Sequence, residues 1–181
     1  MFTIHAGEYL VGLYVQQRLG LNVWIPAKDT GIDLLVTDRE NRRTVSLQAK
    51  YGKDFLPGKS AVLRDSLRCL SWFALNRDKL EASPAEFWVF VLQGFKSDAP
   101  DFVVIPKTEL QRRMMEIHGS DSGKLQSYFC STENNHCWET RGLGNNVMLQ
   151  IARSTYESPV RDFTEYLNEN GWTAVAKKLN R

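Results

Sequence analysis

The chain has 181 residues, of which 43% are hydrophobic and 24% charged, a composition typical of a globular domain that excludes a disordered or fibrous chain. No apolar run approaches the roughly 20 residues that span a bilayer, and no leader-like segment opens the chain. We therefore expect one compact domain without a membrane segment, located in the cytoplasm.

The formal net charge of +2 does not by itself indicate a polyanionic partner, but the charge is unevenly distributed. Residues 39–68 contain eight basic and three acidic side chains. Such a segment can hold a polyanion, although a solvated surface with scattered cations has the same composition. Three cysteines are too few for a disulfide scaffold, which agrees with a reducing compartment.

Hydrophobic periodicity predicts helices and strands along the first two thirds of the chain. Apolar side chains at helical spacing predict a helix over residues 3–19, which Gly20 ends, and another over residues 60–80. Short apolar or alternating runs predict strands, and a further helical pattern follows the last of them. The strands are expected over residues 21–25, 32–37, 44–51, 87–92 and 102–105, and the helix over residues 107–118.

The last third of the chain is less regular. Residues 119–146 are rich in Gly, Ser and Asn and receive no assignment, whereas short helices are expected over residues 160–167 and 172–179. This order of elements predicts a single domain of the α/β class (α+β mixed), with a central mixed β-sheet flanked by helices. In this domain, which covers residues 1–181, we expect a core over residues 1–106 and a helical and loop extension over residues 107–181.

Two carboxylates in the first half do not fit their local patterns. Glu8 falls inside the apolar stripe of the first helix, where an unpaired carboxylate needs a cation, a metal or a hydrogen-bond partner. A position at the edge of the stripe, or a salt bridge, would also explain it. Asp33 opens an apolar strand, where it either caps a turn or aims a carboxylate into a cleft.

Gln48 and Lys50 alternate with Val45, Leu47 and Ala49 and therefore lie on the opposite face of their strand. A lysine at this place is commonly a solvated side chain. Beside a metal-bound carboxylate, however, a lysine is suited to hold a water molecule and help to deprotonate it. The two interpretations remain open on these residues alone.

Taken together, these residues form a recognisable pattern. Glu8 in a first helix, Gly31-Ile32-Asp33 opening one strand and Gln48-Ala49-Lys50 ending the next resemble the PD-(D/E)XK nuclease superfamily. The Gln-x-Lys variant is most similar to the Mrr-type restriction endonucleases. The helix–strand–strand–strand–helix order over residues 3–80 also matches the common core of that superfamily. The resemblance implies a restriction endonuclease-like core within residues 1–106.

The resemblance further implies Mg²⁺-dependent or Mn²⁺-dependent hydrolysis of phosphodiester bonds in DNA. Asp33 would ligate the metal, with the Gln48 amide oxygen and the Ala49 carbonyl as further ligands and Glu8 acting through water. Lys50 would position the attacking water. Ile32 stands where many members have proline, and Gln48 replaces a carboxylate, which should weaken metal binding when no phosphate is present.

Four basic residues follow the predicted catalytic strand and are candidates for contacts to the phosphate backbone: Lys53, Lys59, Arg64 and Arg68. Arg64 and Arg68 would lie one turn apart on the second helix, and a solvated helix face is the alternative. Because each chain would carry one active site, the resemblance also favours a homodimer for double-strand cutting. Trp138, expected in a loop, is the tryptophan that could stack on a base.

Two other hypotheses fit the same residues. The chain could be a module on the same fold that has lost catalysis and binds nucleic acid or a protein. It could also be an unrelated α/β protein in which Glu8 and Lys50 form a buried ion pair. Cys130, His136 and Cys137 lack an evident fourth ligand, so we do not expect a zinc site there.

Overall fold

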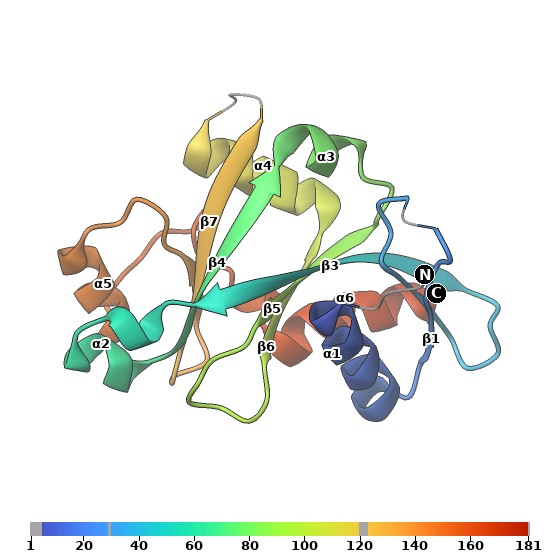
Figure 1. Ribbon diagram of the computed structural model, residues 1–181, viewed down its shortest axis with the longest axis horizontal. Helices are drawn as coiled ribbons and strands as arrows, with labels where there is room; N and C mark the ends of the chain where they lie inside the picture. The colour runs from blue at the N-terminus through green and yellow to red at the C-terminus, as the bar shows by residue number, and fades with distance from the viewer. Residues whose placement is uncertain (1–4, 29, 120–122, 181) are drawn as a thin grey trace.

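The computed structural model describes residues 5–28, 30–119 and 123–180 and shows a mixed α+β fold (Figure 1). A central, largely antiparallel sheet is flanked by helices, as the order of elements predicts. Among the described residues, no helix combines the length and the apolar character that crossing a bilayer requires.

The first part of the sheet is built from five strands in the spatial order β1-β2-β3-β5-β6. Strands β1, β2 and β3 form an antiparallel meander, β5 runs parallel to β3, and β6 is antiparallel to β5. The parallel β3–β5 pair is what makes the sheet mixed. The bounds of these strands are β1 (Asn22–Trp24), β2 (Leu34–Thr37), β3 (Thr44–Asp54), β5 (Phe87–Leu92) and β6 (Asp101–Pro106).

Strand β3 is shared between two parts of the sheet (Figure 1). Its last two residues pair with β4 (Leu67–Asn76), which pairs along its length with β7 (Lys124–Thr132). Strand β8 (Cys137–Glu139) adds to the far side of β7. Beyond their short contact, β3 and β4 diverge, as Figure 1 shows.

Gly52 lies where β4 approaches β3 most closely. A Cβ atom at this position would lie 2.5 Å from Cζ of Phe73 and 2.7 Å from Cβ of Ser71, both of which are buried. We expect Gly52→Ala to lower the free energy of unfolding by about 1–3 kcal/mol, because the extra methyl group overpacks the crossing. Urea denaturation measures this loss. Gly58→Ala is the matched control, since its Cβ would meet nothing within 4 Å. Equal free energies of unfolding for the two variants would contradict the close approach of β4 to Gly52.

Helices cover both faces of the five-stranded part. Helices α1 (Ala6–Tyr14) and α6 (Asn168–Leu179) pack on the face that presents Leu47 and Ala49. Helix α4 (Lys107–His118) packs with β4 and β7 on the other face, against Phe90. A third cluster, under α2 (Ala61–Ser66) and α5 (Asn145–Ala152), covers one end of β4. The face of β3 that carries Gln48 and Lys50 is therefore the face toward β4.

The helix predicted over residues 60–80 is wrong for most of its length. Short helices α2 and α3 (Arg77–Ala82) occupy its two ends, and the ten residues between them form β4. The apolar residues fit helical spacing, but the buried side chains also alternate along the strand, at Leu67, Cys69, Ser71, Phe73 and Leu75. Pairing with the distant β7 decides between the two periods.

The other differences concern the ends of elements and the last third of the chain. Helix α1 stops at Tyr14 and continues as a π-helical segment, Val15–Leu19, which ends at Gly20 as expected. The part of the predicted first helix before residue 5 lies outside the described residues. Strands β7 and β8 fall in the segment that received no assignment. The helix predicted over residues 160–167 is wrong, because only a 3₁₀ turn, Thr164–Tyr166, forms there.

Candidate functional site

Asp33 lies immediately before β2, opposite β3. Gly31 has a φ of 84°, in the left-handed region that favours glycine, and turns the chain into the strand. The backbone N–H of Asp33 donates to the carbonyl of Leu47 at 2.9 Å, one residue out of the register of the β2–β3 ladder, in which Leu47 pairs with Leu34. Asp33 thus lies at the end of the ladder, where its side chain reaches that of Gln48.

Asp33, Gln48 and Ala49 form a hydrogen-bonded group at this end of β2. The Asp33 Oδ2 accepts bonds from the Gln48 side-chain amide and from the Ala49 N–H, the latter at 2.8 Å. Because the N–H and C=O of one strand residue point to the same side, the Ala49 carbonyl also faces Asp33. The structure thus brings together three of the four residues that the resemblance assigns to the metal.

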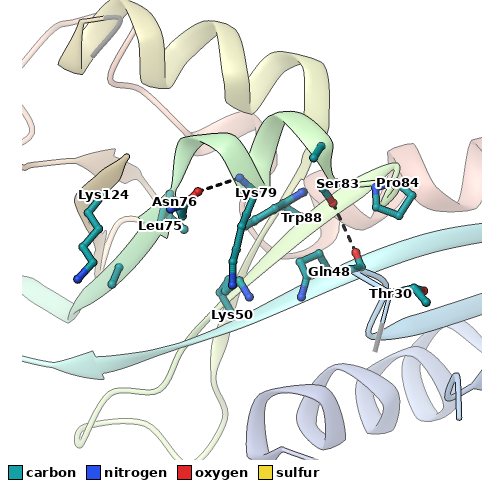
Figure 2. A pocket seen from close by; sticks show the side chains of 13 residues that line it. Thr30, Gln48, Lys50, Leu75, Asn76, Lys79, Ser83, Pro84, Trp88 and Lys124 are labelled. Carbon is teal, nitrogen blue, oxygen red and sulfur yellow. Dashed lines mark hydrogen bonds between the residues drawn. The ribbon is translucent and has the colours of Figure 1, made fainter. Parts of the chain in front are cut away.

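Lys50 follows Gln48 on the same face of β3, and both residues line a cavity of about 610 Å³ (Figure 2). The cavity is lined by residues of β3, β4 and α3 and by Trp88 of β5. The Lys50 ammonium lies 5.5 Å from the centroid of the Trp88 ring. This cation–π contact holds the Lys50 ammonium at one side of the cavity.

Two further lysines line the same cavity, and the sequence pattern did not single them out. Lys79 comes from α3 and Lys124 from β7; in Figure 2 the Lys79 side chain extends toward Lys50, whereas Lys124 lies further along the cavity, beyond Asn76. None of the described residues that line the cavity is acidic. Three lysines in one concave site concentrate positive potential and favour a polyanion. No sequence signal could have placed them there, because Lys124 reaches the cavity through the pairing of β7 with the distant β4, where it lies opposite Asn76.

Glu8, the fourth residue that the resemblance assigns to the metal, belongs to helix α1. Helix α1 covers the face of the sheet opposite to Gln48 and Lys50, and the Glu8 carboxylate accepts a hydrogen bond from the His5 N–H at 3.2 Å. This contact caps the start of the helix. The helix start approaches β3 closely, since a Cβ at Gly7 would lie 3.1 Å from Cβ of Tyr51. Glu8 forms no ion pair with Lys50, so its role toward a metal stays a prediction.

The four predicted phosphate-contacting residues do not share one helix face. Lys53 is exposed at the end of β3, and Lys59 and Arg64 are exposed around α2. Arg68 lies on β4, where its guanidinium contacts Asp101 at 3.1 Å and Asn135 at 2.6 Å. The expected pairing of Arg64 with Arg68 on one helix is therefore wrong, because the helix ends at Ser66.

The donor atoms fit a hard divalent cation that needs few protein ligands. The Asp33 carboxylate and the Ala49 carbonyl supply oxygen, whereas Gln48 directs its amide nitrogen at Asp33. Turning the amide about its last torsion would present its oxygen instead. No group of three or more His, Cys, Asp or Glu side chains that could hold a metal occurs among the described residues. Such a sparse set suits Mg²⁺, which keeps several of its waters.

We expect Gln48→Glu to bind Mg²⁺ about tenfold more tightly than the wild type, because it restores a second carboxylate. Without metal, the new carboxylate would face Asp33 and lose the amide hydrogen bond, which should lower the free energy of unfolding by about 1–3 kcal/mol. Calorimetric titration with Mg²⁺ and thermal unfolding with and without the metal measure both effects. Unchanged metal affinity would contradict a ligand role for residue 48.

Two of the cysteines considered as zinc ligands lie on paired strands, Cys130 on β7 and Cys137 on β8. Both are fully buried, and burial raises the pKa of both thiols. Trp138 is buried in β8, with 6% of its surface exposed. The expectation that it stands in a loop, free to stack on a base, is therefore wrong.

Comparisons with family models, with curated proteins and with solved structures found no match to this chain.

Proposed function

We propose that this chain is a Mg²⁺-dependent nuclease of the PD-(D/E)XK type that hydrolyses phosphodiester bonds in DNA. One observation carries the proposal. The hydrogen-bonded group of Asp33, Gln48 and Ala49 stands next to Lys50, which lines a cavity with three lysines and no described acidic residue. Mn²⁺ is the expected substitute for Mg²⁺, since both prefer oxygen ligands.

The order of elements supports the same proposal. Helix α1 is followed by the meander β1-β2-β3, and β5 then joins β3 in parallel. This agrees with the core that the resemblance implies. The chain departs from the expected core between β3 and β5, where β4 and two short helices replace a single long helix.

The residues of the site have distinct tasks in this proposal. Asp33 and the Ala49 carbonyl would hold the cation. The Gln48 side chain would be a third ligand once its amide has rotated to present the oxygen. A bound Mg²⁺ would neutralise charge on the phosphate and activate the attacking water. Lys50, held beside Trp88, would orient that water and take part in its deprotonation. Attack on phosphorus breaks the bond to the leaving oxygen and produces a phosphate end and a hydroxyl end.

The other two lysines of the cavity are suited to substrate binding. Lys79 and Lys124 are exposed and come from α3 and β7, whereas the hydrogen-bonded group lies between β2 and β3. They can contact phosphates next to the cleaved bond without entering the reaction. Since each chain carries one such site, we expect it to cut one strand at a time unless two copies act together.

The test is a nicking assay on supercoiled plasmid with the purified chain in Mg²⁺, Mn²⁺ or EDTA. The proposal predicts nicking in either metal and none in EDTA. Asp33→Asn, purified in the same way, controls for contaminating nucleases. Activity that persists in EDTA, or that is equal in the variant, would overturn the proposal.

A binding module without catalysis is the second candidate, and the Gln48 amide favours it. This amide donates to Asp33 and so completes the site without a cation. The binding module predicts salt-sensitive retention of DNA with no nicking in any metal. Metal-dependent nicking by the wild type would exclude it.

A further inference from the structure

An aromatic cluster lies on the surface of β4 and β7, next to the cavity. Its members, Phe55, Trp72 and Tyr128, are only partly buried, and Phe55 is 37% exposed. The ring of Phe55 lies edge-on, with centroids 6.4 Å from Trp72 and 6.0 Å from Tyr128. Trp72 and Tyr128 are paired directly across the two strands. We call these three residues the aromatic face.

Two cations flank the aromatic face. The Lys53 ammonium lies 5.6 Å from the centroid of the Phe55 ring, and the Arg141 guanidinium lies 5.8 Å from that of Tyr128. Both side chains are exposed, and no described carboxylate lies within ion-pair distance of either. Aromatic rings beside unpaired cations are the combination that binds bases and phosphates of a single strand.

The aromatic face continues into the cavity along the same side of the sheet. From the pair Trp72–Tyr128, the next pairs are Ala74–Gln126 and Asn76–Lys124. Ala74, Asn76 and Lys124 line the cavity. At about 3.3 Å per residue, the aromatic pair lies roughly 13 Å from the pair that ends at Lys124. The aromatic face and Lys124 therefore lie on the same side of the β4–β7 pair.

We propose that the aromatic face binds a single-stranded stretch of DNA next to the site of cleavage. Bases stack on Trp72 and Tyr128, while Lys53, Arg141 and the lysines of the cavity contact the phosphates. Paired bases in a duplex are already stacked on each other, so the face selects unpaired DNA. The substrate of cleavage is specified in this way only if the chain is the nuclease proposed above. Binding of single-stranded DNA to the aromatic face does not depend on that function and can be measured without metal.

The test is fluorescence anisotropy in EDTA with a labelled oligothymidylate of about 15 nucleotides, a blunt duplex of the same length and an oligouridylate. We expect the wild type to prefer the oligothymidylate. Trp72→Ala and Tyr128→Ala should each raise its Kd about tenfold, whereas binding of the duplex should change little. Trp72→Phe and Tyr128→Phe keep a ring and should bind almost as the wild type does.

Tyr9→Ala is the matched control, because Tyr9 is 56% exposed on α1, which covers the opposite face of the sheet, and its loss should leave the Kd unchanged. Phe55→Ala provides an independent variant if circular dichroism shows that Trp72→Ala does not fold. Equal Kd values for wild type, Tyr128→Ala and Phe55→Ala, or tighter binding of the duplex or of the oligouridylate, would overturn the inference. Ring-dependent binding without metal-dependent nicking would support it and refute only the nuclease.

Discussion

Asp33→Asn is expected to reduce metal-dependent nicking at least about 10³-fold, because it removes the only charged ligand of the proposed cation. The side chain of asparagine has almost the same shape and keeps an oxygen that can accept the hydrogen bond from the Ala49 N–H. The variant therefore separates the loss of charge from the loss of structure. Initial rates of plasmid nicking over a range of Mg²⁺ concentrations measure the effect.

The stability of this variant is the necessary control. Replacing charge-assisted bonds by neutral ones should change the free energy of unfolding by only about 1–2 kcal/mol. Binding of the oligothymidylate in EDTA should persist, since the aromatic face does not include Asp33. A variant that folds, binds and nicks at the wild-type rate would refute the metal site, even if the wild type requires Mg²⁺.

The central strands of the sheet could be predicted from the sequence because their hydrophobic patterns fit a strand and no other element. The six residues Phe87–Leu92 are apolar throughout and fully buried, and the predicted bounds agree with β5. The alternation of Gln48 and Lys50 with Leu47 and Ala49 correctly assigned the two faces of β3. Asp33 and Gln48 meet for the same reason, since the two strands form a short antiparallel hairpin whose register follows from their patterns.

Strand β4 could not be predicted in this way, and neither could the parts of the site that depend on it. Its ten residues satisfy a helical and a strand period at once, and the partner that decides between them, β7, lies about 50 residues further along. The cavity exists because β4 leaves β3 after a short contact at Lys53 and Asp54. Without that crossing, neither Lys79 nor Lys124 can be placed beside Lys50.

The position of Glu8 shows a second limit of sequence patterns. Its place in the apolar stripe indicated a cation, a metal or a hydrogen-bond partner, and the exposed backbone N–H of His5 provides a hydrogen bond locally. A carboxylate that caps a helix start and one that binds a metal through water give the same sequence pattern. In both cases a carboxylate stands where an apolar residue is expected. Only the three-dimensional arrangement distinguishes the capping contact from the hydrogen-bonded group around Asp33.

Lys50→Ala is expected to lower the rate of nicking about 10²–10⁴-fold, the range found for a positioned proton-transfer group. Because Lys50 faces the cavity, forms no ion pair and lies with its ammonium over the Trp88 ring, its removal should cost less than about 1 kcal/mol of stability. A structural ion pair would behave differently, since breaking it would cost about 3–5 kcal/mol. Single-turnover rates and urea denaturation of the same protein distinguish the two roles.

Two further variants determine what Lys50 contributes. Lys50→Arg keeps the charge and the contact with Trp88 but not the compact ammonium, so it should retain substrate affinity and remain slow. Lys79→Ala removes a charge from the same cavity and should weaken binding while leaving the single-turnover rate at saturating DNA unchanged. If both lysine-to-alanine variants weaken binding and neither slows the reaction, Lys50 holds phosphate like its neighbours, and the water must be oriented by another group.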